Sequence, residues 1–204
     1  MTQTPADTTT FDIVILGAGS GGYAAALRAA QLGKTVALIE KEKIGGTCLH
    51  VGCIPTKALL HVAEVADEIN HSSAVGISST LESIDLKEVV AYKDGIVSRL
   101  YGGLQGLIKA AGITVVEGDG KLVGPKTVEV NGQTYTGENL ILATGSESRT
   151  LGVEIGGRVV TSTEALTLTE MPESVVIIGG SVIGVEFASV WKSFGVDVTI
   201  VEGL

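Results

Sequence analysis

Apolar positions along the chain form two patterns, continuous runs and runs with helical spacing. Residues 11–17 (FDIVILG) form a continuous apolar run, residues 23–32 follow with small residues at helical spacing, and residues 35–40 (TVALIE) form a second run. A continuous run of β-branched and aliphatic residues is typical of a strand buried on both faces of a parallel sheet. The three segments fit within about 30 residues, which predicts a βαβ unit.

The same pattern returns later in the chain, so we interpret the two segments as an internal repeat. Residues 174–178 and 196–202 are the predicted strands of the second copy, and its helix ends at about Phe194. Landmarks recur at an offset of 162 positions, which pairs Gly17 with Gly179, Gly22 with Gly184, Gly33 with Gly195 and Glu40 with Glu202. One position departs from the repeat, because Gly19 corresponds to Ser181.

The residues between the two copies predict further helices and short strands. We expect helices over residues 54–71 and 85–111, a hairpin turn at Asn131-Gly132, and strands over residues 113–117, 126–130 and 140–143. Residues 1–10 predict a short disordered lead, and residues 151–172 a mixed connector. The fold class is therefore α/β, with tandem Rossmann-like dinucleotide-binding folds. The second fold is truncated early, since the chain ends two residues after Glu202, and we expect the front part of a longer protein.

Composition narrows the classes of partner and compartment. Of the 204 residues, 45% are hydrophobic and 18% charged, which argues against disorder, and 4% aromatics with 28 glycines favour α/β over an aromatic-rich β-sandwich. A net charge of −9 disfavours nucleic acid and anionic membranes as partners. No apolar stretch approaches the roughly 20 residues of a membrane span. With two cysteines and no signal peptide, we predict a reducing, cytoplasmic location.

The glycine-rich turns carry the first candidate chemistry. Residues 17–22 (GAGSGG) lie between a strand and a helix, and Glu40 ends the next strand. Glycines let the backbone approach a diphosphate, the helix start offers free N–H groups, and a carboxylate there can accept ribose hydroxyls. The second turn, 179–184, has Ser181 at the point of closest approach. Two sites indicate two nucleotides, a flavin and a nicotinamide; the alternative is an ordinary βαβ unit without a ligand.

The cysteine segment, residues 45–57 (GGTCLHVGCIPTK), is the second feature of the sequence that indicates a specific chemistry. In a regular helix, Cα atoms five positions apart are about 8.7 Å apart, whereas a disulfide needs roughly 4.4–6.8 Å. If Cys48 and Cys53 bond, the turn is distorted and the bond is easily reduced. Two alternatives stay open here. Cys48, His50 and Cys53 could be metal ligands, although a fourth ligand and a common zinc spacing are lacking, or both cysteines could be reduced and inert. We expect no metal site, and we interpret His61 and His71 as ordinary helix-face residues.

The segment GGTCLHVGCIPTKALL resembles the redox-active disulfide segment of dihydrolipoamide dehydrogenases, within the glutathione-reductase-like flavoprotein disulfide reductases. The resemblance runs from Phe11 to Glu202 in the family's order. Residues 143–146 (ATGS) are similar to the family's segment that returns to the flavin, and residues 179–186 to its NAD-site segment.

The resemblance implies roles for individual residues. Cys48 and Cys53 would form the redox disulfide, with Cys53 facing the flavin and Cys48 exchanging with substrate. Lys57 would lie near flavin N5, and we predict that Glu186 pairs with it. The remaining FAD-binding residues would be Gly17, Gly19, Ser20 and Gly22 at the diphosphate, Glu40 at the ribose, Lys41 and Gly120 at the adenine, and Gly46, Thr47, Thr144, Gly145 and Ser146 around the flavin. Those of the NAD site would be Gly179, Gly180, Ser181, Gly184, Glu186 and Glu202.

The resemblance also implies a function and an organisation. The function is an FAD-dependent oxidoreductase that oxidises dihydrolipoamide through the disulfide and reduces NAD. Residues 1–150 would be the FAD-binding domain and residues 151–204 the start of the NAD-binding domain. Partners would be a lipoyl-bearing carrier protein of a 2-oxo acid dehydrogenase complex and, in the full-length protein, a second copy in a homodimer.

Departures from the family pattern keep alternatives open. Prolines usually follow the ATG-Ser segment, and residues 148–150 have none. The second flavin segment and the C-terminal dimerisation domain, with its His–Glu acid–base pair, are absent from the chain. The alternatives are a glutathione- or mercuric-reductase-like flavoenzyme, and a non-catalytic FAD- or nucleotide-binding fragment. Glu202 would repel the 2′-phosphate of NADP, which argues against the relatives that use NADP.

Overall fold

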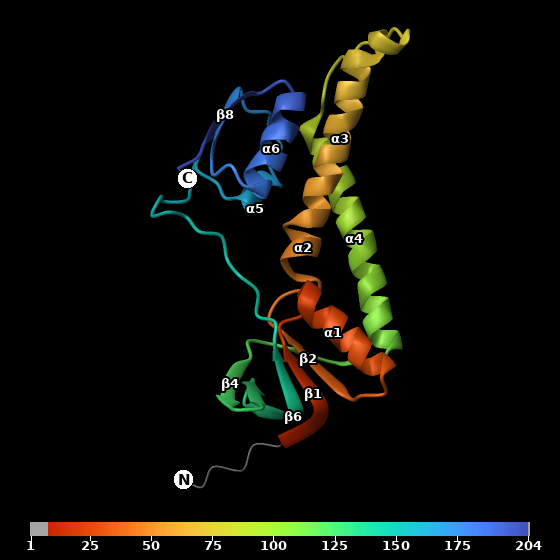
Figure 1. The fold of residues 1–204 in the computed structure, drawn as a ribbon, viewed down its shortest axis with the longest axis vertical. Helices are drawn as coiled ribbons and strands as arrows, with labels where there is room; N and C mark the ends of the chain where they lie inside the picture. Colours follow the sequence, from red (N-terminus) through yellow and green to blue (C-terminus); the bar gives the residue numbers. More distant parts are fainter. Residues whose placement is uncertain (1–7, 204) are drawn as a thin grey trace. The chain divides into compact units, whose positions relative to one another are not determined.

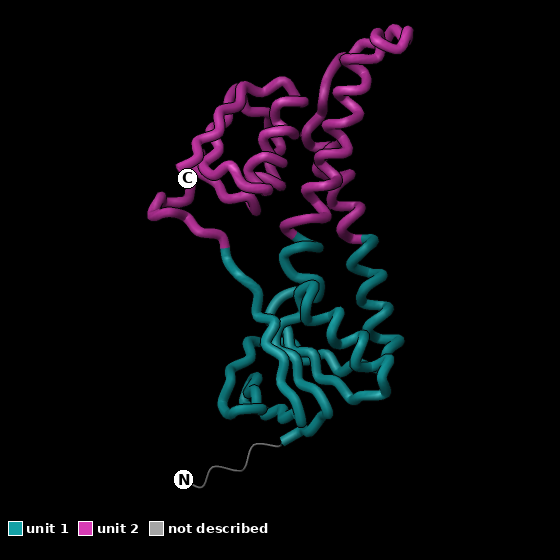
Figure 2. The backbone as a smooth tube through the Cα atoms, in the orientation of Figure 1, with its two compact units in different colours: residues 1–50, 99–147 teal, residues 51–98, 148–204 magenta. Residues whose placement is uncertain are grey.

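The structure, a computed structural model, describes residues 8–203 and divides them into two compact units. Unit 1 holds residues 8–50 and 99–147, and unit 2 holds residues 51–98 and 148–203 (Figure 2). Residues 1–7 of the predicted disordered lead lie outside the described residues. No helix within residues 8–203 is long and apolar enough to cross a membrane.

Unit 1 is built on a six-stranded sheet with the order β3-β2-β1-β6-β5-β4. Figure 1 labels β1, β2, β4 and β6 of this sheet. β1 pairs in parallel with both β2 and β6, β2 pairs in parallel with β3, and β5 is antiparallel to both of its neighbours. The parallel core confirms the predicted α/β class. The strands are β1 (Thr8–Leu16), β2 (Val36–Glu40), β3 (Thr114–Glu117), β4 (Lys121–Gly124), β5 (Thr127–Val130) and β6 (Gln133–Leu142).

The central strands of this sheet are buried on both faces, as their continuous apolar runs predict. On one face, Ile15 and Leu38 form a core with Ala26 of α1 (Ser20–Gln31) and Ile108 of α4 (Leu86–Ala110). On the other face, Val14 and other strand residues pack against β5 through Val128 and Val130. Side chains alternate between the faces along a strand, so each strand contributes to both cores.

The hairpin predicted at Asn131-Gly132 is present between β5 and β6. Asn131 has φ +53° and Gly132 φ +82°, and Val130 pairs with Gln133 across the turn. Two residues with positive φ match the right-handed twist of the joined strands, and asparagine and glycine adopt that conformation most readily. β6 is longer than the predicted strand of residues 140–143, and β4 lies where no strand was predicted.

One local prediction is wrong. β1 begins at Thr8, so the last three residues of the predicted lead belong to a strand, in which Thr8, Thr9 and Thr10 pair with β6. β-branched threonines fit a paired strand, and a neighbouring strand decides their state. The helix predicted over residues 54–71 is confirmed as α3 (Cys53–His71), and the short helix α2 (Gly46–His50) that precedes it was not predicted.

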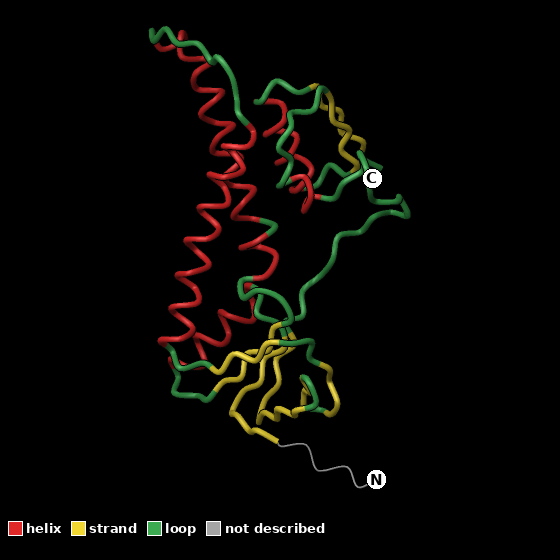
Figure 3. Tube along the Cα trace, turned by 180° about the vertical axis from the view of Figure 1, so that it is seen from behind, coloured by secondary structure: helices red, strands yellow, loops and turns green. Residues whose placement is uncertain are grey.

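Unit 2 contains the second copy of the repeat and the helices that pack on it (Figure 3). β7 (Ser174–Ile178) and β8 (Asp197–Val201) pair in parallel, and α6 (Val182–Ser193) connects them. Phe187, Val190 and Trp191 of α6 form a core with Leu59 and Ala63 of α3. The short helices η1 (Ser72–Val75) and α5 (Ser162–Ala165) were not predicted.

The repeat predicted at an offset of 162 is confirmed residue by residue. α1 covers residues 20–31 and α6 residues 182–193. Ile13 pairs with Val36 in the first copy, and Val175 pairs with Val198 in the second. The two copies therefore share helix bounds and strand register, each within its own unit.

Candidate functional site

The glycine turn of unit 1 follows β1 and is packed tightly against its neighbours. Gly17 has φ +97°, and a Cβ atom built there would lie 2.2 Å from the Ala143 carbonyl oxygen. A Cβ atom at Gly22 would lie 1.9 Å from the Gly17 carbonyl oxygen. Neither separation is physically possible, so both positions need glycine for the turn to close onto α1.

A carboxylate holds this turn from the end of β2. Glu40 Oε2 accepts a hydrogen bond from the Ala18 N–H at 2.7 Å, and Oε1 accepts one from the Glu42 N–H at 2.9 Å. A carboxylate has about four lone-pair sites, so two bonds leave acceptor capacity for ribose hydroxyls. Glu40 therefore shapes the turn as well as lying where the sequence predicts a ribose ligand.

The start of α1 presents backbone donors beside the turn. Gly19 is the N-cap residue, no side chain caps the helix, and the first helical bond runs from the Tyr23 N–H to the Gly19 carbonyl at 2.9 Å. The N–H groups of Ser20, Gly21 and Gly22 precede that bond. A 12-residue helix adds the positive end of its dipole there. These donors and the small side chains fit an anionic diphosphate.

The helix with Cys48 begins directly against the same turn. Gly46 has φ +58°, and a Cβ atom there would lie 2.6 Å from Gly19 Cα. The Gly45 N–H donates to the Ala18 carbonyl at 2.8 Å. Thr47 and Cys48 follow in α2, and Cys48 is half-buried. The structure thus places the predicted flavin-side residues 46–48 next to the predicted diphosphate turn.

The remaining residues predicted for FAD in unit 1 gather at the same edge of the sheet. The Ala143 N–H donates to the Leu16 carbonyl at 2.8 Å, so Thr144, Gly145 and Ser146 leave β6 beside the glycine turn. A Cβ atom at Gly120 would lie 2.5 Å from Leu16 Cδ1. Lys41 is exposed and follows Glu40 directly.

Unit 2 repeats the turn geometry with the second set of residues. Gly179 has φ +109°, and a Cβ atom at Gly184 would lie 1.9 Å from its carbonyl oxygen. Glu202 Oε2 accepts from the Gly180 N–H at 2.6 Å, the counterpart of the bond between Glu40 and Ala18. The carboxylates at the two strand ends therefore hold their turns in the same way.

Ser181 keeps the backbone of this second turn unchanged. Its φ and ψ are −78° and −175°, against −67° and −173° at Gly19, which is extended backbone that any residue adopts. The serine side chain makes no capping hydrogen bond to α6. The N–H groups at the start of α6 therefore keep the arrangement found at α1.

The predicted pairing of Lys57 with Glu186 is confirmed within unit 2. Lys57 Nζ lies 2.5 Å from Glu186 Oε1, which joins α3 to α6 across 129 positions of sequence. The lysine side chain is 57% exposed and the glutamate side chain 23% exposed. The pair is thus formed at a partly solvated surface of the unit.

The two cysteines belong to different units, because the chain passes from unit 1 to unit 2 between His50 and Val51. Cys53 is exposed at the start of α3. Their pairing stays a prediction. Within residues 8–203, no group of three or more histidine, cysteine, aspartate or glutamate side chains is arranged to hold a metal ion.

His61 and His71 lie on α3, as expected of helix-face residues, and each has a local partner. His61 Nδ1 lies 3.6 Å from a Glu64 carboxylate oxygen, and His71 Nδ1 lies 2.8 Å from the Asp67 carbonyl oxygen.

Sequence reasoning missed a buried lysine in unit 2. The Lys93 side chain is 5% exposed, and its ammonium donates to the Leu166 carbonyl at 2.9 Å and pairs with Asp94 at 2.8 Å. A signal was available, since Leu86, Val89 and Lys93 share one face of α4 at helical spacing. A lysine in such a register needs a polar partner inside the unit.

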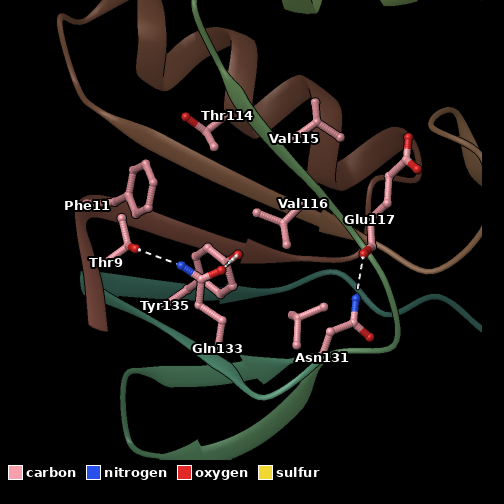
Figure 4. A pocket seen from close by; sticks show the side chains of 10 residues that line it. Thr9, Phe11, Thr114, Val115, Val116, Glu117, Asn131, Gln133 and Tyr135 are labelled. Carbon is pink, nitrogen blue, oxygen red and sulfur yellow. Dashed lines mark hydrogen bonds between the residues drawn. The ribbon is translucent and has the colours of Figure 1, made fainter. Parts of the chain in front are cut away.

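A groove of about 470 Å³ in unit 1 contains no predicted site residue (Figure 4). It lies between the start of β1, β3 and the β5–β6 hairpin, with Phe11 and Tyr135 among its apolar walls. Gln133 bonds to Thr9 and Tyr135, and Asn131 bonds to the Glu117 carbonyl, so polar groups at its rim are satisfied within the unit. We assign it no role in the proposed chemistry.

Comparison with known proteins gives the family of the chain's relatives. The family model described as pyridine nucleotide-disulphide oxidoreductase matches residues 11–204. Among curated relatives, the dihydrolipoyl dehydrogenase of Thermus scotoductus is 42% identical over 195 residues, covering 95% of this chain and 42% of the relative. That of Bacillus subtilis is 44% identical over 209 residues, covering 95% and 44%.

A third relative, the dihydrolipoyl dehydrogenase of Acholeplasma laidlawii, is 45% identical over 199 residues, covering 94% of this chain and 59% of the relative. The chain thus spans about half the length of the curated relatives it matches. These matches confirm the resemblance drawn from the cysteine segment.

Proposed function

Because the chain belongs to the pyridine nucleotide-disulphide oxidoreductase family, we propose that it forms the flavin- and disulfide-bearing part of a dihydrolipoamide dehydrogenase. The observation that carries the proposal is the approach of Gly46 to Gly19, which brings the helix with Cys48 against the glycine turn. A redox-active cysteine beside a dinucleotide turn is the arrangement that electron transfer between a thiol pair and a flavin requires.

The domain proposal follows the repeat. Residues 1–150 would bind FAD, and residues 151–204 would start the NAD-binding domain. Supporting this, the first glycine turn and the 144–146 segment lie in unit 1, and the second turn with Glu202 lies in unit 2. The helical residues 51–98 belong to unit 2 by their contacts, so the cofactor domains and the compact units need not share boundaries.

The residues of unit 1 fit an FAD diphosphate, since the start of α1 offers uncapped N–H groups beside side chains no larger than serine. Glu40 would accept the adenosine ribose hydroxyls with the lone pairs that its turn contacts leave. When bound, the flavin supplies an acceptor for an electron pair from the thiols and a donor of that pair to NAD⁺. The second turn with Glu202 would hold the NAD⁺.

The two cysteines would carry out the thiol–disulfide exchange with the substrate. The two thiols of dihydrolipoamide would reduce the Cys48–Cys53 disulfide, which yields the lipoamide disulfide and two protein thiols without a net change in electrons or protons. Cys48 is half-buried in a five-residue helix, and a substrate thiolate would attack its sulfur in the disulfide, so that Cys53 leaves as a thiolate and a mixed disulfide forms on Cys48. The electron pair then leaves for NAD⁺ with formation of NADH and release of a proton, and the disulfide re-forms.

Glu186 would hold the positively charged ammonium group of Lys57 near the reacting centre. The Lys57 side chain is flexible and more than half exposed, and its ammonium group lies 2.5 Å from the Glu186 carboxylate. This contact restricts the ammonium group to one position. A fixed ammonium stabilises negative charge that develops close to it. The pair also ties α3, which begins with Cys53, to α6 of the nucleotide-binding repeat.

Further features of the proposal concern cofactor choice and partners. Glu202 would accept ribose hydroxyls and repel a 2′-phosphate, which favours NAD over NADP. The reductant would be a lipoyl group on the carrier protein of a 2-oxo acid dehydrogenase complex, in the cytoplasm, with a homodimer as the working assembly. The His–Glu acid–base pair of the family would come from the dimerisation domain.

The test is a substrate comparison on the protein as its source produces it. We expect NAD⁺ reduction by free dihydrolipoamide, with kcat/KM at least tenfold above that for oxidation of NADH or NADPH by glutathione disulfide or Hg²⁺. Cys48→Ser should abolish this turnover. A preference for glutathione disulfide or Hg²⁺ would move the assignment to those reductases, and bound FAD without any thiol-dependent turnover would make the protein a nucleotide-binding module.

A further inference from the structure

We propose that His50 is a positioning residue for the Cys48 thiol. The inference rests on the proposed function, because it concerns the exchange chemistry of the Cys48–Cys53 pair. His50 ends α2, two residues after Cys48, and its imidazole contacts two other parts of unit 1. Its Nε2 lies 2.8 Å from the Ile44 carbonyl oxygen, and its ring lies 5.0 Å from the Tyr101 ring in an edge-to-face arrangement.

The hydrogen bond to Ile44 closes a small loop around Cys48. A carbonyl oxygen only accepts, so His50 donates from Nε2–H, which fixes the tautomer of the neutral ring. The bond joins residues six positions apart and spans Gly45 and Gly46, both of which have positive φ. Glycines have the largest conformational freedom of all residues, so this segment needs contacts from outside to hold one path.

The two ends of α2 are held by different contacts. At its start, Gly46 lies against Gly19, and the Gly45 N–H donates to the Ala18 carbonyl. At its end, His50 is the residue that bonds back to Ile44 and packs on Tyr101 of α4. A helix of five residues has too few internal hydrogen bonds to hold its own conformation. The position of Cys48 therefore depends on both ends, and His50 provides one of them.

This arrangement has a consequence for the redox equilibrium. Closing a disulfide restricts the backbone around both cysteines, and a segment already held in place loses less conformational entropy on closure. Without the His50 contacts, the dithiol form gains freedom and the disulfide becomes easier to reduce. With dithiothreitol as reductant, its two thiols become a cyclic disulfide while the Cys48–Cys53 disulfide becomes two thiols, so electrons and protons balance.

The experiment measures that equilibrium in the flavin-loaded protein as its source makes it. The protein is equilibrated with buffers of reduced and oxidised dithiothreitol, and the thiols are trapped by alkylation and counted by mass spectrometry. His50→Phe keeps a ring beside Tyr101 and removes the donor, whereas His50→Gln keeps a donor near the place of Nε2. His71→Phe is the matched control, because His71 also contacts a backbone carbonyl at 2.8 Å, and both residues of that contact belong to unit 2.

We expect His50→Phe to shift the equilibrium toward the dithiol by about threefold or more, the size expected from one net hydrogen bond. His50→Gln should recover at least half of the logarithmic shift, and His71→Phe should change the constant by less than 1.5-fold. If His50→Phe does not fold, Tyr101→Leu provides the second test, with a smaller shift in the same direction. A constant within 1.5-fold of wild type in every folded variant of His50 and Tyr101 overturns the inference. A wild-type protein that never forms the disulfide overturns the proposed function instead.

Discussion

The Lys57 ammonium donates to the Glu186 carboxylate at 2.5 Å and joins the helix that begins with Cys53 to the helix that follows the second glycine turn. Since the lysine side chain is 57% exposed, solvent screens this pair. We therefore expect a coupling free energy between the two side chains of only about 0.5–1 kcal/mol. A double-mutant cycle with Lys57→Met and Glu186→Gln, followed by denaturant unfolding monitored at Trp191, measures the coupling.

Lys192 provides the control for that cycle. It lies on α6 with Glu186 and forms no ion pair among residues 8–203. Lys192→Met should therefore be additive with Glu186→Gln within about 0.3 kcal/mol. If Lys57→Met is also additive with Glu186→Gln, the two side chains are not energetically coupled and the contact is an ordinary solvated one.

The two glycines of the α1 start predict opposite effects of alanine. A Cβ atom at Gly22 would lie 1.9 Å from the Gly17 carbonyl oxygen, whereas nothing lies within 4 Å of one at Gly21. Gly22→Ala should destabilise unit 1 by about 1–3 kcal/mol or more, and Gly21→Ala should be neutral or stabilising by up to about 1 kcal/mol. Thermal unfolding followed by circular dichroism separates the two. Equal melting temperatures for both variants would mean that the turn is looser than described.

Much of the repeat could be predicted from the sequence because backbone geometry dictates its residues. Gly17 and Gly179 need positive φ, and Gly22 and Gly184 need the absence of a Cβ atom, so glycine marks all four positions. The strands around them are continuous apolar runs, and their burial on both faces of the unit 1 sheet follows from that composition. Ser181 differs from Gly19 without consequence for the path, since the backbone there is extended.

Other features depend on contacts that no local pattern records. α2 is shorter than two helical turns, so no periodic signal precedes it. β4 has mostly exposed residues and forms because β5 pairs with it. The partner of His50, Tyr101, lies 51 positions away on α4, and only the folded unit brings the two rings together.

The cofactor preference should respond to Glu202. Its carboxylate accepts from the Gly180 N–H at 2.6 Å, and in the proposed function it also accepts the ribose hydroxyls of NAD⁺. Glu202→Arg should weaken NAD⁺ use and improve NADP⁺ use, so the ratio of kcat/KM values should move at least threefold. Glu202→Gln controls for the loss of the turn contact, because its amide oxygen still accepts. An unchanged ratio in Glu202→Arg would remove Glu202 from the nucleotide site.

Low pH should reduce the folding stability of unit 1, because the Asp12 carboxylate becomes protonated. The Thr35 N–H and hydroxyl groups, with Lys34 beside them, lower the pKa of Asp12 from 3.8 to about 2. A depressed pKa in the folded state contributes stability above the unfolded pKa, and that contribution is lost as the pH falls from about 4 to about 2.

Carbon-13 NMR of the Asp12 carboxyl group gives this pKa directly, and unfolding at pH 5 and pH 2.5 gives the stability difference. Asp12→Asn should flatten the difference, whereas Asp119→Asn, a control for net charge, should not. An Asp12 carboxyl that titrates near 3.8 would contradict the prediction.

In the proposed function one redox disulfide works with one flavin, and a reductive titration tests this pairing most directly. The flavin-loaded protein is titrated anaerobically with dithionite, and the electrons taken up per flavin are counted from absorbance. A disulfide accepts two electrons and a flavin two, so we expect four electrons per flavin in the wild type and two in Cys53→Ser. Uptake of two electrons by both proteins would contradict it.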